Sequence, residues 1–530
     1  MASPPLDRAT LLARLQDPRT WDVAVIGGGA TGLGVALDAA LRGFSVVLVE
    51  SGDFAQGTSS RSTKLVHGGV RYLAQGNVAL VREALHERSA ILGNAPHLAQ
   101  RFPIIMPSYR WWDTGFYGAG LKMYDVLAGR HGIGSTELLG AARVQHALPN
   151  VRRPGLVGGV QYWDGQFDDA RFAVALARTA AARGALVLNH CAVTSLLREG
   201  GQVRGLELRD RETGTTARVN ARCVINATGV WVDDIRAMDR DAGEAAPKRL
   251  VAPSQGVHLV IDRRFMPGQH GLLVPKTADG RVLFVLPWMG KLIVGTTDTP
   301  RDDVVAEPRA FAQDVGFILA EASRYLEQPP TRADVRSVWV GLRPLVRPSG
   351  EAGEDTKQIS REHTVLVGRS GLVTVTGGKW TTYRAMAEDV LAQAMSRGLL
   401  DTRPGGVSAR VRLVGSAPGR PLAEPPGEHL YGSEAAVLRA LPGADRWLWR
   451  DGQGGLSEAM VRFAARHEMA RSVEDVLARR SRLLLLDARE AARLAEPVAA
   501  LLAEELGAGF DAAVSAAAFT ALAEQYATLP

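Results

Sequence analysis

The chain has 530 residues, 46% of them hydrophobic and 22% charged, which is the composition of a folded globular protein and excludes a disordered or collagen-like chain. Its 62 Lys and Arg residues against 56 Asp and Glu leave a net charge of +6, which is too dilute for a dedicated nucleic-acid binder. The two cysteines, Cys191 and Cys223, form no CxxC pair, which excludes a disulfide scaffold and a cysteine-based zinc site, and we expect no metal.

The N-terminal residues have no continuous apolar stretch of the kind found in a secretory signal. The longest uncharged apolar stretch, residues 23–37, contains five glycines. Because a membrane-spanning helix needs roughly 20 apolar residues, no segment is expected to cross a bilayer. We therefore expect a cytoplasmic chain in a reducing compartment.

A βαβ unit is predicted near the N-terminus. Residues 21–26 form an apolar run typical of a buried strand, residues 33–42 have the pattern of a helix, and residues 44–50 form a second buried strand. The connection between the first strand and the helix is rich in glycine. A strand, a glycine turn and a helix in this order are typical of dinucleotide-binding α/β folds.

Three glycines of this turn, Gly27, Gly29 and Gly32, match the GxGxxG pattern. The first permits a tight turn, the second admits a pyrophosphate, and the third lets the helix pack on the strand. Glu50 ends the second strand 18 residues after Gly32, where a carboxylate accepts hydrogen bonds from a ribose. These four residues predict a dinucleotide site, although the pattern alone does not separate NAD from FAD.

Further strand-like runs are widely spread along the chain, so the sheet must be assembled from distant segments. They cover residues 185–188, 223–226, 258–261, 282–287, 292–295 and 372–376. The run at 223–226 leads into Ala227, Thr228 and Gly229. In flavoproteins with two dinucleotide folds a strand ends in Ala-Thr-Gly beside the cofactor, which favours FAD.

The C-terminal part of the chain is predicted to be helical. From about residue 405 the strand patterns stop, and apolar residues recur at three- and four-residue spacing over residues 433–441, 457–467, 473–486, 488–506 and 510–526. We divide the chain into an FAD-binding oxidoreductase domain (15–405), with an interleaved substrate-binding lobe at about 250–345, and a helical domain (406–530). Arg479, Arg480 and Arg482 are interpreted as a solvated helix face.

Several segments, in one order along the chain, resemble the FAD-dependent glycerol-3-phosphate dehydrogenases, an aerobic and quinone-linked family. They are residues 59–73 (SSRSTKLVHGGVRYL), 284–288 with 295–298, 341–345, 377–384, and 466–470 with 475–480. The resemblance extends from about residue 21 to residue 506. It implies an α/β fold with an FAD-binding two-dinucleotide-type Rossmann domain, an interleaved mixed-sheet substrate domain and an all-helical C-terminal cap. It also implies non-covalent FAD and oxidation of sn-glycerol 3-phosphate to dihydroxyacetone phosphate.

The same resemblance implies roles for single residues. The predicted substrate-binding residues are Arg71, Tyr72, Arg343 and Lys379. Arginine suits a phosphate dianion because its guanidinium stays charged and binds with two parallel donors. The predicted FAD contacts in the family segments are Ser59, Ser60, Lys64, Ala227, Thr228, Gly229, Gly377 and Gly378.

Oxidation at C2 of the substrate requires a base within hydrogen-bond reach of the hydroxyl group. Of the 11 histidines, His67 and His258 lie in family segments; we favour His67, keep His258 as the second candidate, and leave a static role for either open. Arg343 and Lys379 complete the predicted catalytic set, with Lys379 stabilising negative charge on the reduced flavin or binding a substrate oxygen. Many family members carry Lys-Gly-Ser-His before the second histidine, whereas here Val257 replaces the hydroxyl.

The reduced flavin must pass its electrons on, and the sequence contains no second nucleotide pattern and no Cys-rich cluster. The resemblance implies a membrane quinone as the acceptor and a peripheral position on the inner face of the cell membrane. Residues 101–125 mix cations with aromatic side chains, which is typical of an interfacial anchor, although an aromatic cluster is more often core.

Other functions stay open at this point. One is an oxidase that passes electrons to oxygen and releases peroxide, and another is a flavin-containing binding or scaffold protein without turnover. A nucleic-acid-modifying flavoprotein is disfavoured by the modest charge. The sequence also leaves open whether the protein forms a homodimer.

Overall fold

The predicted glycine turn follows a central strand of a mainly parallel sheet in the computed structural model. The structure describes residues 7–69, 77–240, 244–245, 247–278, 280–347 and 363–530. In spatial order the strands are β17 (His363–Val367), β18 (Val373–Gly377), β10 (Thr216–Asn226), β1 (Thr20–Ile26), β2 (Val46–Val49) and β7 (Leu186–Leu188). The pairs from β18 to β7 are parallel, whereas β17 is antiparallel to β18. The predicted α/β fold is confirmed.

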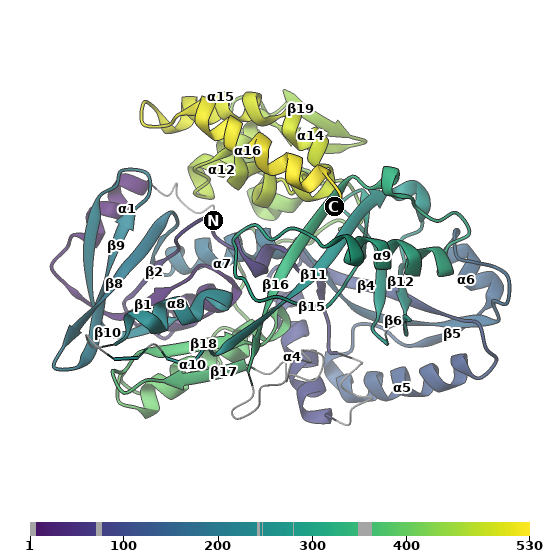
Figure 1. The fold of residues 1–530 in the computed structure, drawn as a ribbon, viewed down its shortest axis with the longest axis horizontal. Helices are drawn as coiled ribbons and strands as arrows, with labels where there is room; N and C mark the ends of the chain where they lie inside the picture. The colour runs from purple at the N-terminus through teal and green to yellow at the C-terminus, as the bar shows by residue number, and fades with distance from the viewer. Residues whose placement is uncertain (1–6, 70–76, 241–243, 246, 279, 348–362) are drawn as a thin grey trace.

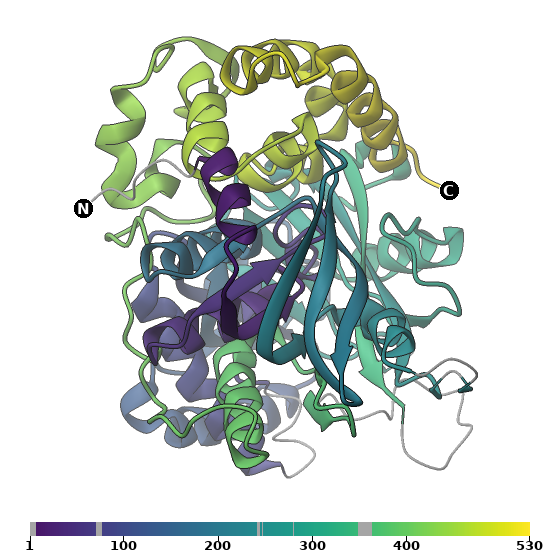
Figure 2. The same ribbon diagram turned by 90° about the vertical axis from the view of Figure 1, so that its left-hand side faces the viewer.

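Helices pack on this sheet, which is why its central strand is apolar on both faces. Val23, Ala24 and Val25 of β1 are completely buried. The glycine turn leads into α2 (Ala30–Leu41), which packs against α7 (Asp169–Ala182) and α10 (Tyr383–Ser396). The strands β8 (Cys191–Glu199) and β9 (Gln202–Asp210) extend from the first half of β10 as an antiparallel hairpin (Figure 2).

A second, mixed sheet forms the lobe that the sequence analysis predicts to bind the substrate. In spatial order its strands are β15 (Thr299–Pro300), β11 (Val251–Asp262), β14 (Lys291–Gly295), β13 (Leu283–Trp288), β12 (Gly271–Val274), β4 (Ala99–Ser108), β6 (Gly158–Phe167) and β3 (Leu65–Val66). In addition, β16 (Ser337–Val346) pairs with β11, and β5 (Glu137–Gly140) pairs with β6. Strands β3 to β6 come from residues 65–167, so the lobe includes a segment ahead of the 250–345 range that the sequence suggests.

The remaining helices of these two lobes lie around the sheets (Figure 1). They are α1 (Arg8–Leu15), α4 (Val78–Asn94), α5 (Asp113–Ala128), α6 (Ala141–Ala147), α8 (Val232–Met238) and α9 (Ala312–Tyr325). Helix α9 packs on β11, β13 and β14, which leaves the opposite face of that part of the sheet for the site. Among the described residues, no helix is both long and apolar enough to span a bilayer.

The C-terminal domain is helical, as predicted, and lies across the top of both sheets in Figure 1. Its helices are α11 (Ala435–Arg439), α12 (Glu458–His467), the π-helical turn η8 (Asp475–Arg480), α13 (Leu483–Leu486), α14 (Ala488–Arg493), α15 (Ala495–Leu506) and α16 (Ala512–Ala527). The structure adds a hairpin of β19 (Trp447–Asp451) and β20 (Gly454–Ser457) that the sequence analysis did not predict. Its two-residue turn begins at Gly452, whose φ of +58° suits glycine.

Three arginines of the C-terminal domain are buried against the FAD-binding domain, so the interpretation of Arg479, Arg480 and Arg482 as a solvated helix face is wrong. These residues are 2%, 2% and 0% exposed. Arg480 donates to the two carboxylate oxygens of Asp53 at 2.5 and 2.9 Å, and Arg479 donates to the same carboxylate. Because Asp53 lies 427 residues before Arg480, a local charge pattern could not reveal this partner.

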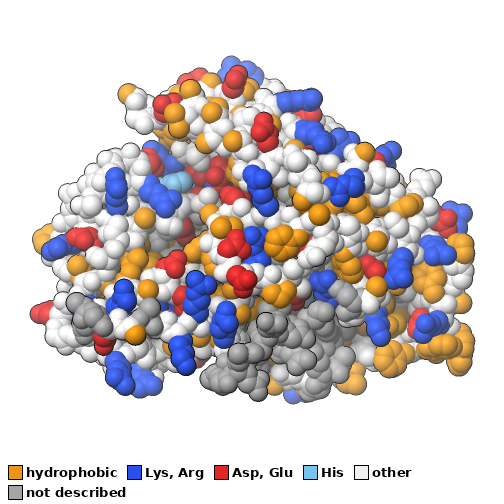
Figure 3. Space-filling view, viewed as in Figure 1, with side chains coloured by type: hydrophobic (Ala, Val, Ile, Leu, Met, Phe, Trp, Pro, Cys, Tyr) orange, Lys and Arg blue, Asp and Glu red, His pale blue; other side chains and the backbone are white. Residues whose placement is uncertain are grey.

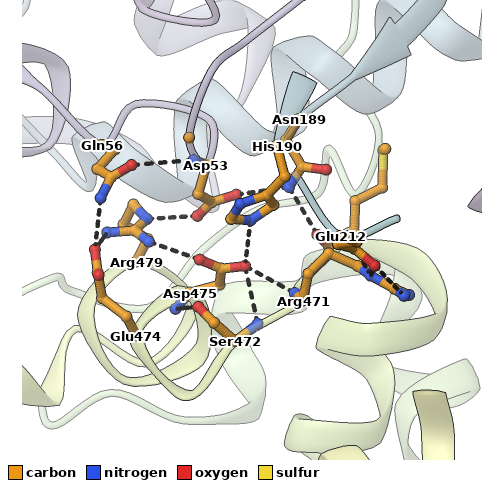
Figure 4. A network of polar contacts seen from close by, with 12 residues as sticks. Asp53, Gln56, Asn189, His190, Glu212, Arg471, Ser472, Glu474, Asp475 and Arg479 are labelled. Carbon is orange, nitrogen blue, oxygen red and sulfur yellow. Dashed lines mark hydrogen bonds and ion pairs between the residues drawn. The ribbon is translucent and has the colours of Figure 1, made fainter. Parts of the chain in front are cut away.

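Figure 4 shows how this contact continues to Asp475 and His190. Acceptor atoms of Asp53, His190 and Asp475 lie within 4.8 Å of one another, a spacing that would also suit a metal ion. However, Arg479 pairs with both carboxylates, and His190 Nε2 lies 3.0 Å from Asp475 Oδ2. Burial opposes ionisation of Asp475, yet His190 and the arginines bring its pKa far below the usual range. We interpret the group as an interdomain ion-pair network.

The substitution Asp53→Asn tests this network. It preserves the shape of the side chain but leaves Arg479 and Arg480 buried with less negative charge, and breaking a buried ion pair costs about 3 to 5 kcal/mol. We expect a clear fall in the thermal unfolding temperature, measured by scanning calorimetry. Asp401→Asn is the control, because Asp401 pairs with Arg222 on the surface and is 64% exposed, so the temperature should stay unchanged. Equal effects of the two substitutions would contradict the network.

Candidate active site

The three predicted glycines have two different roles. A Cβ at Gly27, where φ is +111°, would lie 2.6 Å from the carbonyl oxygen of Ala227, and a Cβ at Gly32 would lie 1.9 Å from the carbonyl oxygen of Gly27. These two glycines therefore allow β1, α2 and the end of β10 to pack closely. Gly29 is different, because a Cβ there would have one neighbour within 4 Å, Ser59 Oγ at 3.1 Å. The surface at Gly29 is otherwise open to a ligand.

Glu50 is oriented by the backbone on both sides of it. Its Oε2 accepts a hydrogen bond from the Gly28 N–H at 2.7 Å, and its Oε1 accepts one from the Gly52 N–H at 2.8 Å. Ser59, in the 3-10 turn Thr58–Ser60, lies beside the N-terminus of α2. Its Oγ accepts a hydrogen bond from the Ala30 N–H at 2.9 Å. An open glycine, a helix N-terminus and an oriented carboxylate are the parts that hold a pyrophosphate and a ribose, so these residues fit FAD.

The other predicted FAD segments meet the glycine turn at one edge of the sheet. Strands β1, β10 and β18 are parallel neighbours, so Ala227, Thr228 and Gly229 after β10 lie beside the end of β18. That end carries Gly377 and Gly378, with φ of +80° and +70°. Ligands of open α/β sheets bind at this carboxyl edge. The fold therefore brings these predicted residues together.

Lys379 and His67 lie next to the same edge. Lys379 follows the glycine pair directly and precedes a short 3-10 turn rather than an α-helix. The backbone N–H of His67 donates to Thr381 Oγ1, in that turn, at 3.2 Å. Both Lys379 and His67 are half-buried. The structure thus places both predicted residues at the end of β18, where the FAD segments converge.

Arg343 and His258 project from one face of the second sheet. In the antiparallel pair of β11 and β16, Arg343 lies opposite Ser254 and His258 lies opposite Trp339, so these side chains share a face. Arg343 Nη1 donates to Asp298 Oδ1 at 3.3 Å, which orients the guanidinium. The Arg343 side chain is 24% exposed and so is both positioned and accessible.

His258 is enclosed on this face and is 2% exposed. Its ring stacks on Trp339 at a centroid distance of 4.1 Å, and its Nε2 lies 3.0 Å from Thr63 Oγ1. Burial, followed by the positive charges of Lys64 and Arg343, lowers the pKa of His258 well below its usual value. His258 is therefore a neutral imidazole, which is the form that accepts a proton.

Lys64 has no exposed surface with which to contact a cofactor, so its predicted role as an FAD contact is wrong. Its Nζ donates to Asp169 Oδ2 and to the carbonyl oxygen of Ser60, both at 2.7 Å. Arg482 donates to Asp169 Oδ1 and to the same carbonyl, both at 2.8 Å. Burial lowers the pKa of Lys64 to about 7. The family segment does face the site, but this side chain lies beneath it, in an ion-pair cluster.

The sequence analysis assigned no role in the site to Thr63, Asp169 or Arg482. Thr63 lies inside the family segment and supplies to His258 a hydroxyl contact that Val257 cannot make. Nothing in the sequence pattern pairs Asp169 with Arg482, because 313 residues separate them. Ser60 is 3% exposed and contributes its carbonyl to the cluster, so a contact of its side chain with FAD stays a prediction.

Arg71 and Tyr72, two of the predicted substrate-binding residues, lie outside the described residues. Their role in binding the substrate phosphate therefore stays a prediction. The site as described rests on the glycine turn, the carboxyl edge of the first sheet and the face of the second sheet that carries Arg343 and His258.

Gly29→Val should yield a colourless purified protein. The added side chain would contact Ser59 Oγ and occupy the open surface where a pyrophosphate approaches the backbone. The readout is the absorbance of the yellow flavin band per mole of protein. Gly316→Val is the control, because a Cβ at Gly316 in α9 meets no atom within 4 Å, and that variant should stay yellow. A fully yellow Gly29→Val protein would refute the assignment of the dinucleotide site.

Family models cover most of the chain. A model described as "FAD dependent oxidoreductase" matches residues 22–384, and one described as "C-terminal domain of alpha-glycerophosphate oxidase" matches residues 428–512. The mitochondrial glycerol-3-phosphate dehydrogenase of Homo sapiens is 41% identical over 95% of this chain and 73% of its own length. The mitochondrial enzyme of Arabidopsis thaliana is 40% identical over 94% of this chain and 85% of its own length.

Solved structures agree with these matches. The glycerol-3-phosphate dehydrogenase of Bacillus halodurans, complexed with FAD, is 29% identical, covers 98% of both chains and has a TM-score of 0.77. The L-alpha-glycerophosphate oxidase of Mycoplasma pneumoniae, with FAD bound, shares the fold at 17% identity and a TM-score of 0.56 over 74% of this chain and 99% of its own. The matches agree with the FAD site built from Gly29, Glu50 and the strand ends. The chain therefore belongs to the FAD-dependent oxidoreductase family, among the glycerol-3-phosphate dehydrogenases.

Proposed function

We propose that this protein oxidises sn-glycerol 3-phosphate to dihydroxyacetone phosphate and passes the electrons through FAD to a membrane quinone at the inner face of the cell membrane. The observation that carries the oxidation is the likeness to glycerol-3-phosphate dehydrogenases along 95% of the chain, together with an oriented arginine and a neutral histidine on one sheet face. The test is anaerobic bleaching of the flavin band by glycerol 3-phosphate. A protein whose flavin does not bleach would instead be a binding or scaffold protein.

Arg343 is suited to the substrate phosphate because its guanidinium is fixed before the ligand arrives. Asp298 and the backbone of Thr297 each accept a hydrogen bond from it, at 3.3 and 2.9 Å. These contacts orient the guanidinium, and its planar arrangement of donors suits a phosphate dianion. Lys379, at the end of β18, supplies a second positive charge near the converging FAD segments.

The oxidation at C2 removes a proton from the hydroxyl group and a hydride, which is the hydrogen with its bonding electron pair, from the carbon. FAD, when bound, supplies the two-electron acceptor for this chemistry. The protein must supply the proton acceptor, and His67 and His258 are the two candidates. Burial, followed by the charges of Lys64 and Arg343, lowers the pKa of His258, which favours the neutral form that can accept a proton.

Support for a membrane contact comes from α5, where aromatic side chains are exposed rather than buried. Trp112, just before the helix, and Phe116, Met123 and Val126 follow one another at spacings of four, seven and three residues, which places them on one helix face. They are 50%, 74%, 52% and 78% exposed, and Trp111 is 81% exposed. The opposite side of α5, with Gly118, Leu121, Tyr124 and Ala128, is buried. Figure 3 shows the resulting group of hydrophobic side chains at the lower right, over α5.

Cations adjoin this apolar stripe. A groove of about 530 Å³ beside the start of α5 is lined by Arg110, Arg152, Lys276 and Arg324. Exposed aromatic side chains next to cations are the combination that holds a protein at an anionic lipid surface. This arrangement favours a peripheral membrane contact, and hence a lipid-soluble quinone, over an aromatic cluster that belongs to the core.

An oxidase is the second candidate function, because the family model of residues 428–512 is described after alpha-glycerophosphate oxidase. The two functions differ in the acceptor. Peroxide released without quinone, at a rate equal to substrate turnover, would favour the oxidase, whereas turnover that depends on added quinone would favour the dehydrogenase. The exposed stripe on α5 favours the latter.

Arg343→Ala should weaken activity with glycerol 3-phosphate far more than with glycerol, which has no phosphate. Each charge-assisted hydrogen bond contributes roughly 1.5 to 3 kcal/mol, so kcat/KM for the phosphorylated substrate should fall by at least about tenfold. Arg336→Ala is the control, because Arg336 lies just before β16 and pairs with Asp262 instead. An equal loss for both substrates would mean that Arg343 has a structural role.

Replacing Trp111 and Trp112 by Ser should weaken binding to anionic vesicles and quinone reduction together. Activity with a small soluble dye should survive, because the FAD segments lie elsewhere in the fold. Vesicle sedimentation at low and high salt measures the binding, since salt screens the contribution of the cations. Phe311→Ser with Val514→Ser is the control, because Phe311, just before α9, is 37% exposed and Val514, in α16, is 64% exposed, and both lie away from α5. Full vesicle affinity of the tryptophan variant would place the membrane contact elsewhere.

A further inference from the structure

Thr63 is a partly exposed residue that contacts the buried His258. His258 is 2% exposed, so a substrate hydroxyl has almost no surface through which to reach its ring directly. Thr63 is partly exposed, and its Oγ1 lies 3.0 Å from His258 Nε2. A hydroxyl can accept one proton while it donates another. The side chain is therefore in the position of a bridge between an outer hydroxyl and the imidazole.

We propose that Thr63 relays the proton of the substrate C2 hydroxyl to Nε2 of His258. The proposal rests on the proposed oxidation of glycerol 3-phosphate. As the O–H bond of the substrate breaks, its proton passes to Thr63 Oγ1, while the proton of the Thr63 hydroxyl passes to His258. FAD, when bound, would be the two-electron oxidant that takes the C–H electron pair with its hydrogen, so that the C2 carbonyl can form. Thr63 is regenerated, and His258 holds the proton.

Both neighbours of Thr63 are bound to one carboxylate, which fixes the relay. Ser62 Oγ and Lys64 Nζ each donate to Asp169 Oδ2 at 2.7 Å. The Lys64 N–H also donates to Ser62 Oγ at 3.1 Å. The other oxygen of Asp169 accepts from Arg482 of the C-terminal domain at 2.8 Å. Arg482, Asp169 and Lys64 are therefore positioning residues, since they act on Thr63 through the segment that carries it.

The surroundings of His258 suit a temporary proton acceptor. Trp339 covers one face of the ring, and the charged groups that face it are Lys64 and Arg343. These cations keep the imidazole neutral before the reaction and favour release of the proton afterwards. The charge of Lys64 is in turn balanced by Asp169, and Arg482 binds both Asp168 and Asp169.

The decisive experiment compares Thr63→Val with Thr63→Ser. Valine has nearly the shape of threonine but no hydroxyl, and loss of a positioned proton transfer costs about 100-fold or more in rate. Anaerobic flavin reduction by glycerol 3-phosphate should slow by about that factor in Thr63→Val, and Thr63→Ser should recover most of it. Binding of dihydroxyacetone phosphate, measured by calorimetry, should change little in either variant, because Arg343 is untouched. The solvent deuterium effect on flavin reduction should differ between Thr63→Val and Thr63→Ser.

The outcomes separate the relay from the proposed function. If the unaltered protein does not bleach with glycerol 3-phosphate, the proposed function fails. If it bleaches and Thr63→Val bleaches equally fast, the relay is wrong. If Thr63→Val loses its flavin, Thr63→Ala is compared with Thr63→Ser instead. Equal rates of flavin reduction in these two variants would overturn the relay.

A second measurement tests the positioning residues without turnover. In Arg482→Met, amide hydrogen exchange of residues 58–67 should become faster, because Asp169 loses one of its two cations. Arg178→Met is the matched control: Arg178 makes another buried interdomain pair, with Glu434 at 2.6 Å, away from this segment. If the amide exchange rate of residues 58–67 rises equally in both variants, or rises in neither, the positioning role of Arg482 is overturned.

Discussion

The buried carboxylate of Asp169 is the contact on which the arrangement of the site depends. One oxygen binds Ser62 and Lys64 of the segment that faces the site, and the other binds Arg482 of the C-terminal domain. A buried charge is costly unless it is paired and hydrogen-bonded, so the three side-chain donors to Asp169 also hold their own segments in place. Three distant parts of the chain thus meet at one group.

The C-terminal domain is therefore part of the active site without supplying an exposed side chain to it. Its arginines reach into the FAD-binding domain at two places, Asp53 near Glu50 and Asp169 beneath the Thr63 segment. Arginine suits this role because its guanidinium stays charged when buried and donates in several directions. These arginines therefore connect the C-terminal domain to two separate carboxylates of the FAD-binding domain.

Two groups of residues depart from the usual distribution of side chains, and both departures follow from their partners. Arg479, Arg480 and Arg482 are buried because carboxylates of another domain receive them. Trp112 and Phe116 are exposed because the other face of α5 already packs on the protein. A buried cation needs a partner within the molecule, whereas a large exposed apolar stripe indicates a partner outside it.

The sequence by itself determined the βαβ unit, the roles of Gly27, Gly29 and Gly32, the family and the helical nature of the C-terminal domain, because periodicity, glycine spacing and family segments are local. Only the tertiary structure decided that Lys64 is buried, that Thr63 meets His258, and that Arg482 pairs with Asp169. The sequence separation is 195 residues for the contact of Thr63 with His258 and 313 residues for the pair of Asp169 and Arg482. Local patterns carry no information about which distant group shares a buried space. The burial of a charge is set by its partner, and the partner is set by the fold.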